Sequence, residues 1–321
     1  MHRGYTHLGG SLKSNLKVLI QAERVRVFSG HDAPVYALEE SVQSGHFFSA
    51  GGDKLVADWG LLSETEARGF VNARYTIYSL KLSPDKRQLL IGDSNGSMLV
   101  VDLQQGKQTR NLRVHTKSVF SIMIDENANR IFTTGADGFF AVWNFDDFSL
   151  VFSQKYCDEK IRSATLHKDL GEIALACGDG QIRILDAETF VLKNTFSAHE
   201  MSVNTVCYHP FKPWLISGGR DAMIRIWNAN DKKLLHSIPA HNYAVYSIVF
   251  SPDCKFFASA SRDKTIKIWD SEQADFLIRI DLEKCGGHIH SVNTLLWLKS
   301  DNLLLSAGDD RKIMAWKIMQ S

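Results

Sequence analysis

Three residue types that can act together in acid–base chemistry recur along this chain: a histidine, a hydroxyl residue and an aspartate. In the first set His31 precedes Ser49 by 18 residues and Asp53 by 22, and four more sets keep the same intervals. A serine beside a histidine and an aspartate is the arrangement that hydrolases use, with one nucleophile next to one base. A single active site would not be copied five times at fixed spacing. We therefore interpret the sets as structural and expect the chain not to be an enzyme.

Every set also contains a tryptophan six residues after the aspartate. The five complete sets are His31, Ser49, Asp53 and Trp59; His115, Thr133, Asp137 and Trp143; His199, Ser217, Asp221 and Trp227; His241, Ser259, Asp263 and Trp269; and His288, Ser306, Asp310 and Trp316. In two further units the same register holds Ala73, Ile91, Asn95 and Val101, and Cys157, Leu175, Asp179 and Leu185. The first six tryptophan-type positions are 42 residues apart and the last interval is 47, so seven units fill nearly the whole chain.

Each set is predicted to lie on a β-hairpin. In the sixth unit Thr265–Trp269 alternates apolar and polar residues, as a half-buried strand does. The polar turn 262–264 precedes it, and the run Phe256–Ala260 supplies the partner strand. His241 stands 28 residues before Trp269 and is followed by a further, inner strand. The unit therefore consists of a loop that carries the histidine, an inner strand and a hairpin.

The order and spacing of these residues resemble those of WD-repeat β-propellers, whose units span about 40–45 residues and carry Gly-His and Trp-Asp landmarks. Gly-His occurs at Gly30-His31 and Gly287-His288, and Trp-Asp at Trp269-Asp270. The resemblance covers roughly Arg24 to Ile318, and the units are as regular as those of bacterial WD-repeat proteins. It implies an all-β fold, a seven-bladed β-propeller whose blades are four-stranded sheets.

The resemblance also implies a role for each set. The aspartate accepts a hydrogen bond from the histidine ring, the other ring nitrogen meets the hydroxyl, and the hydroxyl meets the tryptophan indole N–H. Every buried polar atom then has a partner. In the two units that lack the set, Ile91 with Val101 and Leu175 with Leu185 are expected to form apolar pairs, which avoids an orphaned polar group.

The ring is expected to close through its N-terminal strand. Arg24–Phe28 occupies the place before His31 that the outer strand Leu234–Ile238 occupies before His241. Little chain follows Trp316, so Arg24–Phe28 should complete the last blade and remove two sheet edges. We accordingly predict an N-terminal extension at residues 1–23 and a propeller at residues 24–321. The longer last unit places an insertion at Ser271–Gly287, expected to be a surface loop, with a partner-binding role as the alternative.

Composition excludes several classes of protein. The 321 residues carry a net charge of +1, without the basic excess of a nucleic-acid binder. No run of eighteen apolar residues predicts a membrane helix, and because the first twenty residues contain no continuous apolar core we expect no secretory signal. We expect a monomer with no nucleic-acid or membrane partner.

No cofactor or metal site is predicted. The five cysteines are odd in number and show no Cys-x-x-Cys spacing, which favours free thiols in a reducing cytoplasm. His288 and His290 resemble a metal-binding pair, but His288 belongs to a set and no third ligand is evident.

The remaining functional candidate is a surface. The resemblance implies that the loops entering each blade and the middle turns open on one common face, here named the loop face. Candidate partner-binding residues point to it from two positions per unit: Tyr36, Tyr78, Phe120, Arg162 and Tyr246, five residues after the histidine position, and Arg220 and Arg262, one before the turn acid. Aromatic residues and arginine dominate the energetics of protein interfaces. We expect the first three to form an apolar arc and the three arginines a basic arc. The alternative is that the aromatics pack around the axial channel and the arginines are solvated or paired.

These observations predict a non-catalytic scaffold that binds partner proteins or peptides on the loop face. The alternative is a reader of a small molecule or modified peptide in the axial mouth, where aromatic side chains could hold a cation.

Overall fold

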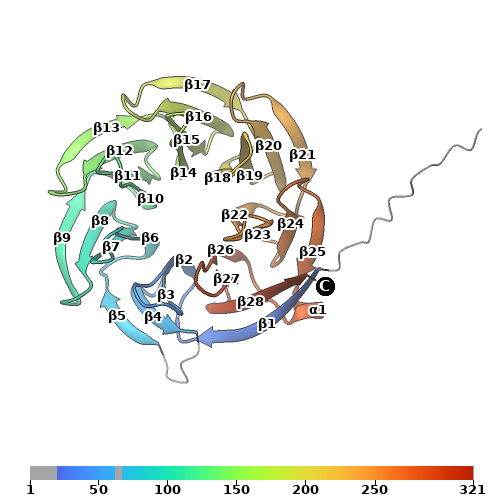
Figure 1. The fold of residues 1–321 in the computed structure, drawn as a ribbon. Coiled ribbons are helices and arrows are strands. Elements are labelled where there is room, and N and C mark those ends of the chain that lie inside the picture. Colours follow the sequence, from blue (N-terminus) through green and yellow to red (C-terminus); the bar gives the residue numbers. More distant parts are fainter. Residues whose placement is uncertain (1–19, 62–66, 321) are drawn as a thin grey trace, which may run out of the picture.

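A computed structural model describes residues 20–61 and 67–320 of the chain. The described strands form seven four-stranded antiparallel sheets arranged as blades around a central axis (Figure 1). This architecture confirms the prediction of an all-β, seven-bladed β-propeller. Among the described residues, no helix is long and apolar enough to cross a membrane.

Each blade runs from an inner strand at the axis to an outer strand at the rim. Blades 1 to 3 comprise β2 (Val35–Glu40), β3 (His46–Gly51), β4 (Leu55–Gly60) and β5 (Arg68–Asn72); β6 (Ile77–Leu82), β7 (Gln88–Asp93), β8 (Ser97–Asp102) and β9 (Lys107–Arg113); and β10 (Val119–Asp125), β11 (Arg130–Gly135), β12 (Phe139–Asn144) and β13 (Leu150–Lys155). Blades 4 to 6 comprise β14 (Ile161–His167), β15 (Glu172–Cys177), β16 (Gln181–Asp186) and β17 (Leu192–Ser197); β18 (Val203–Tyr208), β19 (Trp214–Gly219), β20 (Met223–Asn228) and β21 (Leu234–Pro239); and β22 (Val245–Phe250), β23 (Phe256–Ser261), β24 (Ile266–Asp270) and β25 (Phe276–Ile280).

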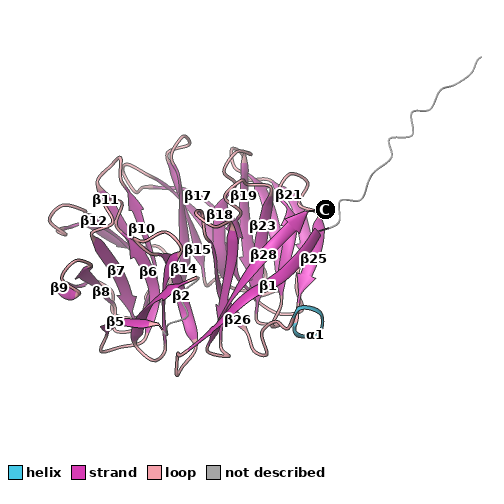
Figure 2. Ribbon diagram, turned by 60° about the horizontal axis from the view of Figure 1, so that its bottom comes forward, coloured by secondary structure: helices cyan, strands magenta, loops and turns pink. Residues whose placement is uncertain are grey.

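Blade 7 closes the ring. It contains β26 (Val292–Trp297), β27 (Leu303–Gly308), β28 (Lys312–Gln320) and, as its outer strand, β1 (Ile20–Ser29). β1 runs antiparallel to β28, with Arg24 opposite Trp316, and Figure 2 shows the two strands side by side. This confirms the predicted closure by an N-terminal strand. The strand is longer than the expected Arg24–Phe28 because residues 20–23 also pair with β28; residues 1–19 of the predicted extension lie outside the described part of the chain.

The hydrophobic core lies between neighbouring blades. Strands β23 and β24 bury residues on both faces because each sheet is sandwiched between two others. One cluster, for example, joins Ile216 and Ile226 of blade 5 to Val245 and Trp269 of blade 6. A blade therefore cannot bury its apolar faces alone, and closure of the ring completes the core.

The predicted insertion at Ser271–Gly287 holds the outer strand β25 and a one-turn helix, α1 (Leu282–Cys285). Asp281 caps the helix by accepting a hydrogen bond from the Lys284 N–H at 2.9 Å, and Gly286 ends it in the left-handed conformation. Arg24 of β1 donates to the carbonyl of Gly286. The insertion thus packs against the strand that closes the ring.

Candidate functional site

The five polar sets form closed hydrogen-bonded relays. In blade 6 the His241 Nδ1–H donates to Asp263 at 3.0 Å, the Ser259 hydroxyl donates to His241 Nε2 at 2.8 Å, and the Trp269 indole N–H donates to Ser259 Oγ at 2.9 Å. A carboxylate only accepts, so the proton lies on Nδ1 and Nε2 must accept from the hydroxyl. The relay ties the loop that enters the blade to the two strands of its hairpin.

The other four relays repeat these contacts. The indole N–H lies 2.7, 3.2, 3.0 and 2.8 Å from the hydroxyl oxygen for Trp59, Trp143, Trp227 and Trp316. All five hydroxyl residues are fully buried: Ser49, Thr133, Ser217, Ser259 and Ser306. Each hydroxyl is engaged by both a histidine and a tryptophan, so the relays offer no nucleophile that a substrate could reach.

Electrostatics supports neutral histidines and ionised aspartates in the relays of blades 5 and 6. Burial lowers the pKa of His199 and of His241, and the neighbouring aspartates offset this only in part. Burial alone would raise the pKa of Asp263, but the hydrogen bonds that it accepts from His241, Thr265 and the Asn242 N–H outweigh burial and hold that pKa below its usual range. A neutral imidazole is what the donor–acceptor order of the relay requires.

Blade 4 replaces its relay with a cluster that the sequence analysis missed. The ligand atoms of Cys157, Cys177 and Asp179 lie within 4.8 Å of one another. Cys157 stands at the histidine position and Asp179 at the acid position, so the register itself was the available signal. The hydrogen bond with Cys177 lowers the pKa of Cys157 to about 6. These three groups could contact one metal ion, but Arg183 already binds both carboxylate oxygens of Asp179, at 3.1 and 2.6 Å.

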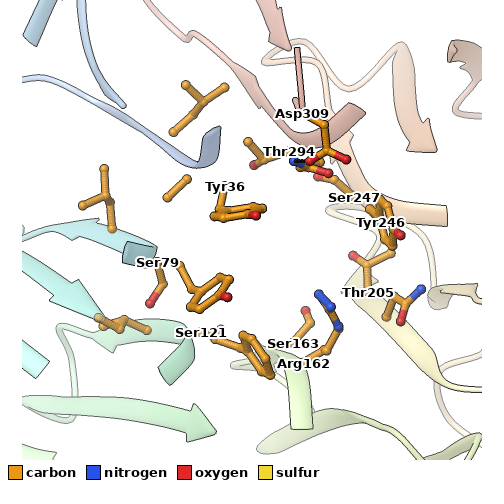
Figure 3. A pocket seen from close by; sticks show the side chains of 18 residues that line it. Tyr36, Ser79, Ser121, Arg162, Ser163, Thr205, Tyr246, Ser247, Thr294 and Asp309 are labelled. Atoms are coloured by element: carbon orange, nitrogen blue, oxygen red, sulfur yellow. Dashed lines mark hydrogen bonds between the residues drawn. The ribbon is translucent and has the colours of Figure 1, made fainter. Parts of the chain in front are cut away.

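The axial mouth collects one residue from every blade. The cavity, of about 470 Å³, is lined by the seven residues that stand five positions after the histidine position: Tyr36, Tyr78, Phe120, Arg162, Asn204, Tyr246 and Asn293 (Figure 3). Each of these residues is the second residue of the inner strand of its blade, just after the loop that enters the blade. The propeller therefore brings together side chains that are spread over most of the chain.

Aromatic rings form one wall of this cavity. The ring centroids of Tyr36 and Tyr78 are 5.0 Å apart, and those of Tyr78 and Phe120 are 5.3 Å apart in an edge-to-face arrangement. The Arg162 guanidinium follows, 5.0 Å from the Phe120 ring and 6.0 Å from that of Tyr246. Such distances are within the range of cation–π attraction. The aromatic rings of three consecutive blades are thus followed around the cavity by one partly buried cation.

The other two candidate arginines lie outside this cavity. Arg220 is exposed at the turn between β19 and β20. Arg262 is exposed at the next blade's turn, 5.9 Å from the Tyr243 ring, beside a depression that Lys264, His290 and Asp309 also line. The loop face thus carries cationic side chains around its mouth as well as within it.

A second cavity, of about 400 Å³, lies at the opposite ends of the strands. His209, Phe211 and Cys254, from the turns that follow β18 and β22, line it together with Ile20 of β1. Phe211 is 83% exposed, which is unusual for a large apolar side chain, and the sequence analysis did not single it out. His209 is buried and bonds to the Ser271 hydroxyl at 2.9 Å.

Comparisons with known proteins agree with this geometry. The family model described as "WD domain, G-beta repeat" matches residues 22–57, 106–144, 190–228, 232–270 and 281–317. WD repeat-containing protein 36 of Homo sapiens is 31% identical over 135 residues, which cover 41% of this chain and 15% of that protein. Apoptotic protease-activating factor 1 of Rattus norvegicus is 28% identical over 216 residues, which cover 63% of this chain and 17% of that protein. The chain thus spans less than a fifth of either relative.

The WD40 β-propeller domain of Doa1, known from a crystal structure, has a similar fold, with a TM-score of 0.82. The two chains are 18% identical, and the match covers 93% of this chain and 97% of the other. At this identity the likeness concerns the fold alone. The family model matches more than half of the residues of this chain, and the chain folds into a β-propeller of seven four-stranded blades. The chain therefore belongs to the WD40 repeat family.

Proposed function

We propose that this chain is a non-catalytic scaffold that binds partner proteins or peptides on its loop face, through the axial mouth and the rim around it. The observation that carries the proposal is the convergence of seven equivalent positions on one cavity, four of them aromatic and one an arginine. Nothing in the relay geometry requires these residue types at the mouth, because the relays lie within the blades.

The rim around the mouth adds further contact area. Tyr243 is 60% exposed and Met201 is 44% exposed, and both lie in loops that enter blades. Arg220 and Arg262 stand on the same face. Tyrosine and arginine are enriched among the residues that carry most of the binding energy of an interface, because they combine apolar area with hydrogen-bonding capacity. The free cysteines fit a reducing compartment such as the cytoplasm.

A second candidate function is a reader of a small molecule or modified peptide in the mouth. The volume of about 470 Å³ supports it, because ligand pockets commonly measure about 300–1,000 Å³. The two functions differ in their ligands. If the chain is such a reader, a small compound that binds in the mouth should raise its melting temperature, since a ligand that binds only the native state stabilises that state.

The scaffold proposal is tested by affinity purification with a triple variant, Tyr36→Ala, Tyr78→Ala and Arg220→Ala. We expect wild-type protein to co-purify specific proteins and the triple variant to lose them. Phe211→Ala, on the opposite ends of the strands, is the control and should keep them. Circular dichroism and thermal unfolding establish that each variant is folded. An unchanged set of bound proteins with the folded triple variant would exclude the loop face as the docking site.

A further inference from the structure

We propose that the axial mouth binds the carboxylate of an acidic side chain from a docked partner segment, with Arg162 as its anchor. This inference rests on the proposed function and specifies the chemistry of the partner. It depends on three features of the mouth: the isolation of Arg162, the orientation of its guanidinium and the charge of the other residues around it.

Arg162 lacks an acidic partner. Its Nε is buried without a hydrogen-bond partner, and among residues 20–61 and 67–320 no carboxylate lies within ion-pair distance of its guanidinium. Two other partly buried arginines do have acidic partners: Arg183 lies 2.6 Å from Asp179, and Arg225 lies 2.7 Å from Asp221. A buried cation without a counter-charge is costly, so binding of an anion at this point gains more than at an exposed arginine.

The neighbouring rings leave one side of the guanidinium free. Phe120 and Tyr246 flank Arg162, and Figure 3 shows its nitrogens pointing toward the centre of the mouth. Apolar flanks lower the local dielectric and strengthen an ion pair formed there. A guanidinium presents two parallel N–H groups that match the two oxygens of a carboxylate. The hydroxyl groups of Tyr78 and Tyr246 line the same cavity and can donate to such a ligand.

The charges of the mouth favour a carboxylate over the other ligand chemistries considered. Among the described residues, Arg162 and Asp309 are the only charged ones that line the cavity, and they lie on opposite sides (Figure 3). Asp309 accepts a hydrogen bond from the Asn293 amide at 2.8 Å. Phosphate groups are usually bound by clusters of arginines, which this cavity lacks among its lining residues. A ligand cation near Phe120 or Tyr246 would be repelled by Arg162, which already faces both rings.

The probe for a direct test is an acetylated, amidated tetraglutamate peptide, titrated into the 321-residue chain by isothermal calorimetry at low ionic strength. The matched controls are the tetraglutamine peptide and the same tetraglutamine peptide with one phosphoserine in place of a glutamine. We expect tetraglutamate to bind wild-type protein and Arg162→Met to weaken that binding about 10- to 100-fold, the size of one lost charged hydrogen-bond pair. Arg162→Lys keeps the charge but not the paired N–H geometry, so its affinity for tetraglutamate should lie between those of the wild-type protein and Arg162→Met.

Arg87→Met is the control variant. It removes the same charge from an exposed turn of blade 2 at the far ends of the strands, so binding should stay as in wild type. No binding of tetraglutamate to wild-type protein, equal binding to Arg162→Met, or tighter binding of the phosphoserine peptide would each overturn the carboxylate assignment.

The same variants separate this inference from the scaffold proposal. If affinity purification shows partners lost from the Tyr36, Tyr78 and Arg220 triple variant but kept by Arg162→Met, the scaffold stands and the acidic anchor is wrong. If both variants keep every partner, both proposals are wrong. Loss of partners from both variants, together with tetraglutamate binding that depends on Arg162, supports both proposals.

Discussion

Blades 4 and 5 are neighbours that build the same sheet in two different ways. In blade 5 the His199 ring joins Asp221 at 2.8 Å and Ser217 at 2.8 Å, and the Trp227 indole N–H completes the relay. In blade 4 the corresponding hydroxyl and tryptophan positions are Leu175 and Leu185, both fully buried in one apolar cluster. In blade 2 the same two positions are Ile91 and Val101, which are also fully buried in one apolar cluster.

The comparison shows that the hydroxyl and tryptophan positions of a blade tolerate either a hydrogen-bonded polar pair or a fully apolar pair. A half-converted blade would leave a buried donor or acceptor unpaired, which costs about 1–3 kcal/mol. The segments that match the family model stop short of most of blades 2 and 4, where the relay is missing. These blades nevertheless keep four strands and the same register, so the relay stabilises a blade without being required for its architecture.

The largest expected difference between these blades concerns their acids. Asp221→Ala should lower the free energy of unfolding by about 3–5 kcal/mol, because it leaves both His199 and Arg225 without their buried carboxylate. Asp179→Ala in blade 4 should cost at most about 1 kcal/mol, because the Asp179 side chain is 30% exposed and pairs mainly with Arg183. Urea unfolding at neutral pH measures both. Similar losses for the two variants would contradict a special role of the relay.

The next effect concerns the hydroxyl at the centre of a relay. Ser259→Ala should cost about 2 kcal/mol, because the buried indole N–H of Trp269 and the Nε2 of His241 both lose their partner. Trp269→Phe removes that N–H, so it should cost about 1 kcal/mol less in the Ser259→Ala background than in wild type. A double-mutant cycle by urea unfolding measures this coupling. Strictly additive losses would show that the hydroxyl and the indole act independently.

Acid should weaken the relay blades more than the apolar ones. Burial lowers the pKa of His199 and His241 in the folded protein below the ordinary value of 6.5, so the unfolded chain binds more protons as the pH falls through that value. Their contribution to stability is present above pH 6.5 and is lost below it. The lowered pKa values of Asp137 and Asp310 add a second loss below about pH 4.

Hydrogen exchange followed by mass spectrometry tests this prediction. After correction for intrinsic exchange rates, protection of β19 and β23 should fall between pH 7 and pH 5 more than protection of β7 in blade 2. Equal loss in the three strands would mean that the relay histidines do not set the pH dependence.

The smallest effect is expected in an apolar blade. Ile91→Val removes one buried methyl group and no hydrogen bond, and should cost about 1 kcal/mol. Thr133→Val, at the same register position in blade 3, also keeps an apolar branched shape but orphans His115 and Trp143, and should cost about twice as much. Urea unfolding of the two single variants compares them directly, and a larger loss for Ile91→Val would reverse the argument.

Much of the fold could be predicted because its determinants repeat. The 42-residue interval between successive tryptophan-type positions, from Trp59 to Trp269, defines the blades. Each relay also needs particular residue types at particular positions. The start of β1 at Ile20 was not predicted, because it depends on how far β28 extends to pair with it. The cluster around Cys157 and Cys177 was also not predicted, because Cys177 stands at none of the relay positions and approaches Cys157 only when the strands of blade 4 pair.

The sequence by itself determined the number of blades, the members of each relay and the strand that closes the ring. These depend on contacts within one unit or between equivalent units, and such contacts leave a periodic pattern. Only the tertiary structure decided which of the seven mouth residues touch and that Arg162 has no acidic partner there. Those properties arise when the ring closes, as in the hydrogen bond from the Asn293 amide to the Val35 carbonyl across 258 residues. No local pattern encodes which charges then meet around a shared axis.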